Sequence, residues 1–169
     1  FASAFYDCSA LRSIPSALFA GCSKVTTFDS AFRNCTLLEY IPSDVFQGCS
    51  SVTSFADTFV YCTSIESVPE GLFDDCPNVT SFFYTFWQCA SLIEIPVSLF
   101  DKHRWIQRCQ CLFSGCPKLQ GESPYTMLNG NKVHLYEREN YPDFLESARI
   151  GVYSCEINGL SYDYIKPQE

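Results

Sequence analysis

The stretch FDSAFRNCTLLEYIPSDVFQGCSSVTS, residues 28–54, decides the fold, because the stretch directly after it repeats its pattern. Residues 55–81 read FADTFVYCTSIESVPEGLFDDCPNVTS, and phenylalanine, cysteine, aliphatic residues and proline return in the same places. The shared unit is F-x3-F-x2-C-x2-L-x2-I-P-x2-L-F-x2-C-x2-V-T-x. A fixed period between about 20 and 50 residues predicts a solenoid, in which each coil buries its apolar residues by stacking on its neighbours.

The repeat has a constant step of 27 in the numbering, and it runs from residue 1 to residue 119 as columns of identical or similar residues. The two cysteine columns are Cys8, Cys35, Cys62, Cys89, Cys116 and Cys22, Cys49, Cys76. Three phenylalanine columns begin at Phe1, Phe5 and Phe19, and they hold 13 of the 15 phenylalanines. Because cysteine is among the most buried residue types, we interpret the column cysteines as free thiols that fill the coil interior. Disulfides between stacked cysteines are the alternative.

Composition and charge exclude several classes of function. The chain has 169 residues, 47% of them hydrophobic, and a formal net charge of −8. Such a chain can bury a core, lacks the positive charge that nucleic-acid binding needs, and contains no apolar run of the ~18–20 residues of a membrane helix. Residues 1–100 carry three basic and ten acidic side chains, a net charge of −7. We therefore expect the repeat region to favour a basic or neutral protein partner.

Local signals within each unit favour short strands and turns over a stack of helical hairpins. A half-unit step of 13 or 14 gives each coil two similar sides, and the apolar spacing also fits an amphipathic helix. A helix through the Ile-Pro step would cost about 3 kcal/mol per unit. Residues 24–28, 51–55 and 78–82 are rich in β-branched and aromatic residues, so we expect strands there. Residues 15–21 and 69–75 begin with proline, so we expect one short helical or 3₁₀ turn in each.

The repeat resembles the cysteine- and phenylalanine-containing leucine-rich repeats of bacterial surface proteins, the BspA-like group, over residues 1–119. The resemblance lies in two patterns, F-x2-C-x2-L-x2-I-P and C-x2-V-T-x-F-x3-F-x2-C. The resemblance implies an α/β, right-handed, leucine-rich-repeat-type solenoid of about four coils, with stacked short parallel strands and short helical turns. It also implies a secreted or cell-surface bacterial protein that binds rather than catalyses. The common pattern L-x2-L-x-L-x2-N is absent from this sequence.

The two ends of the repeat region differ. Residues 1–5 align with residues 28–32, so the chain opens in mid-repeat and we expect the natural protein to continue upstream. At the other end, His103 occupies a cysteine slot and Cys109 a phenylalanine slot. We expect residues 120–169 to form a C-terminal cap on a solenoid of residues 1–119.

Three segments of this cap carry a structural signal. Asn129-Gly130 lies between two apolar runs and predicts a hairpin. Residues 141–146 are a candidate helical turn, and residues 155–167 resemble a loosened copy of the repeat.

The candidate functional residues lie in outward slots between the columns. The possible partner-binding surface comprises Glu39, Tyr40, Glu66, Tyr84, Trp87 and Trp105. Aromatic residues dominate interface hot spots, although aromatic residues in these slots could also cover the edge of the core. The sequence predicts adhesion or recognition of a protein or glycan, with a purely structural spacer as the other hypothesis. We expect no catalytic site, cofactor or metal, because no catalytic motif is present.

Three cysteines fall outside the columns and are candidates for a disulfide: Cys109, Cys111 and Cys155. One pair of them could join the last repeat to the cap. By residue type, His103, Cys109, Cys111 and Cys116 also suggest a zinc site. We favour no metal there, because His103 and Cys116 already have column positions and strong zinc motifs contain paired C-x2-C sequences.

Overall fold

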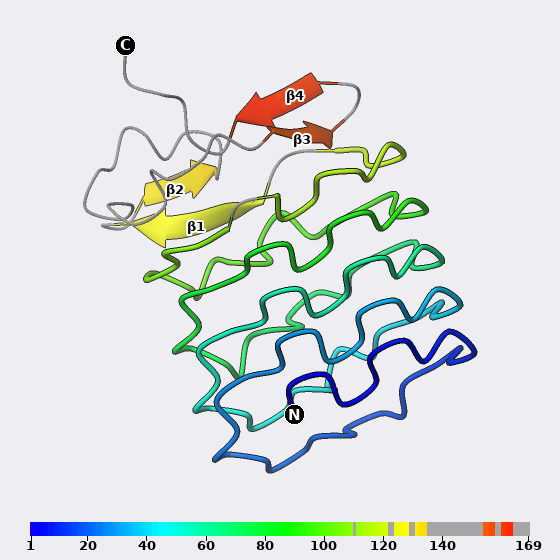
Figure 1. Cartoon of the computed structure of the whole chain (residues 1–169). Coiled ribbons are helices and arrows are strands. Elements are labelled where there is room, and N and C mark those ends of the chain that lie inside the picture. Colours follow the sequence, from blue (N-terminus) through cyan, green and yellow to red (C-terminus); the bar gives the residue numbers. More distant parts are fainter. Residues whose placement is uncertain (110, 122–123, 129–130, 135–153, 158–159, 164–169) are drawn as a thin grey trace.

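Most of the chain forms a stack of coils with one turn per repeat unit (Figure 1). The structure is a computed structural model that describes residues 1–109, 111–121, 124–128, 131–134, 154–157 and 160–163. Parallel bridges join Ser13 to Tyr40, Thr27 to Ser54, Ser54 to Ser81, Ser67 to Glu94 and Ser81 to Arg108. The two members of every pair are one repeat step apart in the sequence, so the predicted solenoid is confirmed. We number the coils as coil 1 (residues 1–27), coil 2 (28–54), coil 3 (55–81) and coil 4 (82–108).

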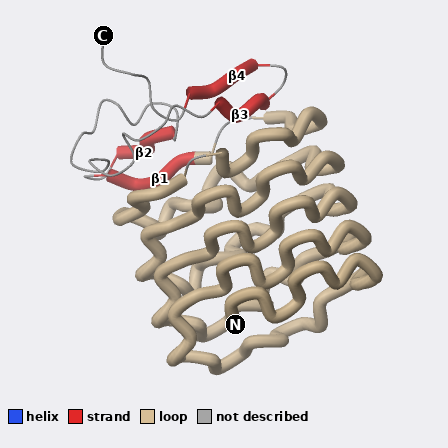
Figure 2. Tube along the Cα trace, in the orientation of Figure 1, coloured by secondary structure: helices blue, strands red, loops and turns tan. Residues whose placement is uncertain are grey.

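The helical turns expected from the sequence are wrong for the described residues, which contain no α-helix and no 3₁₀ segment (Figure 2). The α/β class is therefore wrong for this part of the chain. The reason is local: Ala17 (φ 53°), Gly21 (φ 75°) and Gly71 (φ 71°) take left-handed conformations, whereas an α-helix needs consecutive residues near φ −63°. The strands expected at 24–28, 51–55 and 78–82 are reduced to single bridge residues.

Two bridged faces alternate with two turn columns around each coil. The Tyr40 face holds the bridges at residues 13, 40, 67 and 94, and the Ser54 face holds those at 27, 54, 81 and 108. The first turn column contains residues 1–8, 28–35, 55–62 and 82–89, and the second contains 15–22, 42–49, 69–76 and 96–103. This arrangement matches the half-unit spacing in the sequence.

Backbone amides in the turn columns alternate between two kinds of acceptor. In coil 2, the Ser30 amide donates to the Ala56 carbonyl of the next coil at 2.9 Å. The adjacent Ala31 amide instead donates to Phe28 of its own turn, also at 2.9 Å. Successive amides thus close a turn and join two coils in alternation. The backbone satisfies its donors without helix or extended sheet.

Stacked phenylalanine rings fill the interior. In the Phe5 column, ring centroids of successive coils lie 5.2–5.5 Å apart with nearly parallel planes. The other two columns interleave, so Phe55 lies 4.7 Å from both Phe46 and Phe73. From coil 2 onward these rings are fully buried, as the columns predict.

The column cysteines donate their thiols to backbone carbonyls of the preceding coil. Cys62 Sγ lies 3.1 Å from Phe32 O, and Cys49 Sγ lies 3.4 Å from Phe19 O. Burial raises the pKa of Cys49 to about 11 and the pKa of Cys76 to about 12, so both thiols are protonated at neutral pH. These buried cysteines form no disulfide, which confirms their interpretation as thiols that fill the interior.

Two antiparallel hairpins lie at the C-terminal end of the stack (Figure 1). Their strands are β1 (Tyr125–Leu128), β2 (Asn131–His134), β3 (Ser154–Ile157) and β4 (Leu160–Asp163). The β1–β2 pairing confirms the hairpin predicted around Asn129-Gly130. The repeat-like copy expected at 155–167 is wrong, because β3 pairs with β4 in a second hairpin. The helical turn expected at 141–146 lies outside the described residues.

Strand β1 is hydrogen-bonded to the last coils of the solenoid. The Tyr125 amide donates to the Val97 carbonyl at 2.9 Å. The buried Thr126 hydroxyl donates to the His103 carbonyl at 2.6 Å. These two bonds fix the start of the hairpin against the second turn column of coil 4.

Candidate functional site

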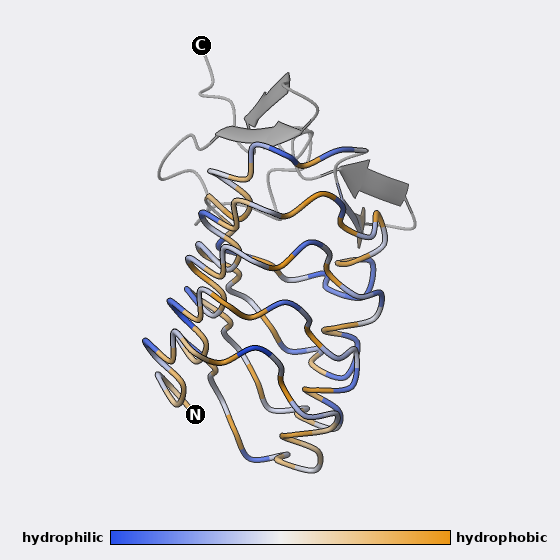
Figure 3. Ribbon diagram, turned by 90° about the vertical axis from the view of Figure 1, so that its right-hand side faces the viewer, coloured by the Kyte–Doolittle hydropathy of each residue, from blue (hydrophilic) through white to orange (hydrophobic). Residues whose placement is uncertain are grey.

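The six candidate partner-binding residues lie on three sides of the solenoid. Glu39, Tyr40 and Glu66 belong to the Tyr40 face, Tyr84 and Trp87 to the first turn column, and Trp105 stands beside the Ser54 face. Figure 3 shows hydrophilic and hydrophobic residues alternating along each coil, so side chains that do not belong to the core occur all around the stack. The structure therefore does not bring the six residues together into one patch.

The Tyr40 face is polar and open to solvent. Glu39 accepts a hydrogen bond from Arg12 of coil 1 at 2.9 Å, and the two side chains are 62% and 65% exposed. Tyr40 is 57% exposed, and Glu66 is exposed on the next coil. An exposed ion pair of this kind contributes little to stability. This face offers Tyr40 as an isolated anchor among carboxylates.

Tyr84 and Trp87 belong to a cluster of four aromatic side chains, which we call the aromatic patch: Tyr61, Phe83, Tyr84 and Trp87. The Trp87 ring lies 5.1 Å from Tyr61 and 5.3 Å from Tyr84, and the Tyr84 ring lies 4.1 Å from Phe83. Tyr61 is 37% exposed, and the other three are partly buried by their neighbours. Adjacent rings at these distances and tilts stabilise one another.

Sequence reasoning missed Tyr61 and Phe83 as members of this patch. The Tyr61 amide donates to the Trp87 carbonyl at 3.0 Å, so the turn columns place side by side two residues whose numbers differ by 26. An alignment of the sequence at a step of 27 therefore does not reveal that Tyr61 and Trp87 are neighbours. A second comparison of the sequence at a step of 26 would have paired Tyr61 with Trp87.

One ion pair and a second arginine lie close to the aromatic patch. Arg33 forms a partly buried ion pair with Asp57 at 2.6 Å. Burial raises the pKa of Asp57 above its ordinary value, although Arg33 opposes this effect. The Arg108 guanidinium lies over the Phe83 ring, 4.7 Å from its centroid, within the range of a cation–π interaction. The patch is thus aromatic, with one neighbouring arginine in an ion pair and the other on the Phe83 ring.

Trp105 is the most exposed large hydrophobic residue of the described chain, at 72%. Its neighbour Ile106 is buried in the coil, so the backbone turns one side chain inward and the next outward. Asn78 and Ser51 hold the same slot in the preceding coils. The solenoid therefore does not require an aromatic residue at this position.

The four residues that suggested a zinc site by residue type are not brought together. Among the described residues, no three His, Cys, Asp or Glu side chains come together as a possible metal ligand set. The physical reason is that His103 lies in the second turn column, whereas Cys116 continues the cysteine column of the first. His103 Nε2 lies 3.2 Å from the Cys76 carbonyl, and burial lowers the pKa of its imidazole.

The three disulfide candidates lie at the junction between the solenoid and the hairpins. Cys109 and Cys111 are buried, and burial raises the pKa of Cys111, although a hydrogen bond to Tyr84 opposes this shift. Cys111 forms no disulfide in this structure. Cys155 belongs to β3, whose side chains lie outside the description, so a bridge between Cys155 and the last repeat stays a prediction.

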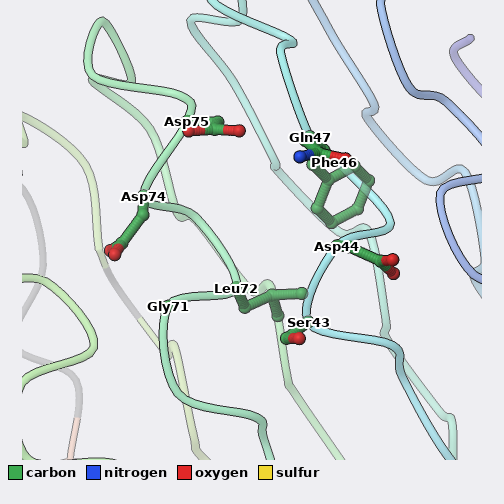
Figure 4. A pocket seen from close by; sticks show the side chains of 8 residues that line it. All are labelled: Ser43, Asp44, Phe46, Gln47, Gly71, Leu72, Asp74 and Asp75. Carbon is green, nitrogen blue, oxygen red and sulfur yellow. The ribbon is translucent and has the colours of Figure 1, made fainter.

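A hollow in the second turn column gathers several carboxylates (Figure 4). It is lined by Ser43, Asp44, Phe46, Gln47, Gly71, Leu72, Asp74 and Asp75. Each carboxylate already has a partner in a neighbouring coil: Asp44 accepts from Ser16, Asp74 pairs with Lys102, and Asp75 accepts from the Gly48 amide. Hydrogen bonds from Ser16 and the Ala17 amide lower the pKa of Asp44. These carboxylates join successive coils.

Comparisons with known proteins give one weak similarity. No family model matches the chain, and no curated protein matches it. A solved structure, the leucine rich repeat protein from T. pallidum, is similar at 15% identity and a TM-score of 0.33, covering 66% of this chain and 52% of that protein. The chain thus spans about half the length of that protein. These comparisons do not confirm the BspA-like group. Separately, no stretch of the described residues forms a helix that could cross a lipid bilayer.

Proposed function

We propose that this chain is a non-catalytic recognition module of a secreted or cell-surface bacterial protein, and that it binds a protein or glycan through outward side chains of its coils. The observation that carries the proposal is the presence of large aromatic side chains in slots where the repeat needs none. Tyr40 stands where coils 1 and 3 have Ser13 and Ser67, and Trp105 where coil 3 has Asn78. Exposed aromatic residues of this kind are typical anchors of interfaces.

The proposed location rests on the resemblance of the repeat to bacterial surface proteins. The buried, protonated thiols are compatible with it, since Cys49 and Cys76 are held away from solvent and stay unreactive. The acidic repeat region favours a basic or neutral partner over nucleic acid or anionic lipid.

A structural spacer is the second candidate function, and a specific observation favours it. Many outward polar side chains bind the neighbouring coil, as Arg12 binds Glu39 and Asn34 binds Asp7. A spacer would need these contacts and nothing else. Tyr40 and Trp105 are exposed in slots that other coils fill with serine or asparagine, which is why we place recognition first.

Replacing outward aromatic residues by the residues of other coils separates the two functions. The test variant carries Tyr40→Ser and Trp87→Val, because Ser13 and Val60 hold these slots elsewhere and preserve the repeat. Native chain and variant are immobilised and exposed to a panel of purified extracellular-matrix proteins and to a glycan array, and circular dichroism verifies that both are folded. Recognition predicts that the native chain binds a member of the panel and the variant does not. Equal binding by both chains contradicts an anchor role of Tyr40 and Trp87, and binding by neither contradicts recognition and leaves the spacer.

A further inference from the structure

The aromatic patch is a feature that the solenoid does not require. Its four slots hold small or polar residues in most other coils: Ala2, Asp29 and Ala56 for Phe83; Ser3, Ser30 and Asp57 for Tyr84; Tyr6, Arg33 and Val60 for Trp87; Asp7, Asn34 and Gln88 for Tyr61. The coils stack through the backbone and the inward columns, which are complete without these rings. Aromatic rings in these slots are therefore more than the stack requires.

Two members of the patch have strained backbones. Tyr61 (φ 58°) and Tyr84 (φ 55°) take the left-handed conformation that the turn columns impose at these slots. Asn34, Ser30 and Asp57 fill the equivalent slots in other coils, and short polar residues of this kind tolerate positive φ better than bulky ones. Strained residues persist where surrounding structure holds them and are concentrated at functional sites. Two aromatic residues in such slots, each beside Trp87, are more than the repeat needs.

The chain itself shows which chemical group these rings accept. The guanidinium of Arg108 lies 4.7 Å above the Phe83 ring. Aromatic faces attract cations, and arginine is the cation most often found there. Around the patch, Arg33 is neutralised by Asp57, and residues 1–100 carry a net charge of −7. A cationic partner is thus drawn toward the repeat region by its long-range field.

We infer that the aromatic patch binds arginine side chains of a basic segment in a partner protein, with the guanidinium groups seated on Tyr61, Tyr84 and Trp87 as Arg108 is seated on Phe83. This inference rests on the proposed function, since it names the partner chemistry of one recognition surface. It also limits that surface to the first turn column of coils 3 and 4.

The test uses Trp87 as its own reporter. The chain contains two tryptophans, so Trp105→Asn, which restores the residue type of Asn78, leaves Trp87 as the sole tryptophan. This variant is titrated with a short peptide of alternating arginine and glycine, and in parallel with the same peptide carrying lysine or uncharged citrulline instead of arginine. We expect a saturable change of Trp87 fluorescence with the arginine peptide, weaker binding of the lysine peptide, and none of the citrulline peptide. Added salt should weaken the arginine complex.

Variants of the patch and of a distant aromatic residue locate the site. Calorimetry with the arginine peptide should show affinity reduced at least about tenfold by Tyr84→Ser combined with Trp87→Val. Tyr61→Asn should also weaken binding while Trp87 still reports it. Tyr6→Val is the matched control, because Tyr6 is more exposed than Tyr61 but lies in coil 1, away from the patch, and it should leave affinity unchanged.

The outcomes separate this inference from the proposed function. Equal binding of citrulline and arginine peptides, or full affinity in the patch variants, overturns the arginine site. If the native chain binds a neutral glycan at the patch and no arginine peptide, the inference is wrong and the proposed recognition function stands. If the chain binds neither the arginine peptide nor any member of the protein and glycan panels, both are wrong.

Discussion

Phe55→Ala should be among the most damaging single substitutions in the solenoid. The Phe55 ring is fully buried in coil 3 and contacts four other rings: Phe46 and Phe73 at 4.7 Å, Phe28 at 5.6 Å and Phe82 at 6.0 Å. Truncating a buried phenylalanine costs about 3–5 kcal/mol through lost transfer free energy and the cavity left behind. Four lost ring contacts keep this site well inside that range, at about 4 kcal/mol.

Phe1→Ala is the matched comparison, because Phe1 begins the same column but is 49% exposed and contacts only Phe19 and Phe28 among the rings. We expect a loss of about 1 kcal/mol there, in proportion to its smaller burial. Guanidinium chloride unfolding, followed by circular dichroism, measures both free energies. Phe55→Leu, expected to cost about 1.5 kcal/mol, keeps the comparison measurable if the alanine variant does not fold. A loss below about 1.5 kcal/mol for Phe55→Ala, or equal losses at Phe55 and Phe1, would refute the stacked core as the main source of stability.

Three further predictions follow from titratable and charged groups. Burial lowers the pKa of His103 below its ordinary 6.5, so the folded state should lose stability as the pH falls below about 6.5. His103→Cys, which restores the column residue, should remove this loss. Melting temperatures of the two chains that change in parallel between about pH 7.5 and 5 would contradict the prediction. Exposed Cys8 should react with iodoacetamide in the native state. Cys62 and Cys89 should react only after unfolding, because burial raises their pKa values. Equal labelling rates of the three cysteines, measured by mass spectrometry, would show that the coils open readily. Arg12→Ala should change the free energy of unfolding by less than about 0.5 kcal/mol, because its ion pair with Glu39 is exposed. Arg33→Ala should lower it by about 1 kcal/mol or more, because the Arg33–Asp57 pair is partly buried. Equal losses of the two variants in chemical unfolding would count against the role of burial.

The sequence was sufficient to predict the interior because the interior is periodic. A step of 27 placed Phe32, Phe59 and Cys62 in columns, and the structure stacks them in the same order. Even the irregular position of His103 was correctly located, since its ring occupies the slot that follows Cys76. Packing between identical neighbours depends on residue type and spacing alone, which a sequence displays directly.

The turns were harder to predict, because proline at the start of a segment is compatible with both a helical turn and a left-handed one. An informative signal was the glycine before three of the column cysteines, because Gly21, Gly48 and Gly115 all have positive φ. A glycine in the left-handed conformation at this position ends a helical turn, because a helix cannot continue through a residue with positive φ. In the same way, Asn158-Gly159 is a hairpin signal equal to Asn129-Gly130, and it correctly marks the β3–β4 hairpin that the repeat-like interpretation of 155–167 obscured.

The candidate surface was only partly predictable for a geometric reason. Backbone hydrogen bonds between coils in the first turn column join residues 26 apart and place Tyr61 beside Trp87, whereas the inward columns follow a step of 27. Searching at the core period therefore found Tyr84 and Trp87 on coil 4 but not Tyr61 on the preceding coil. No repeat rule predicts which outward slots carry aromatic residues, since these slots are free of the packing constraint.

That freedom explains how such a solenoid can carry a specific surface. Coils are joined by backbone hydrogen bonds, such as Ser30 N to Ala56 O, and by inward columns, so an outward substitution changes few contacts that hold the stack. Because stability in a repeat protein is approximately a sum of coil and nearest-neighbour contributions, a change confined to coil 4 leaves the other interfaces intact. In the first turn column, coil 4 holds three aromatic residues in outward slots, Phe83, Tyr84 and Trp87, where coils 1 to 3 hold mostly small or polar ones. A recognition site can therefore be placed on one or two coils while the remaining coils keep the core, and it should be removable, slot by slot, with residues the chain already uses elsewhere.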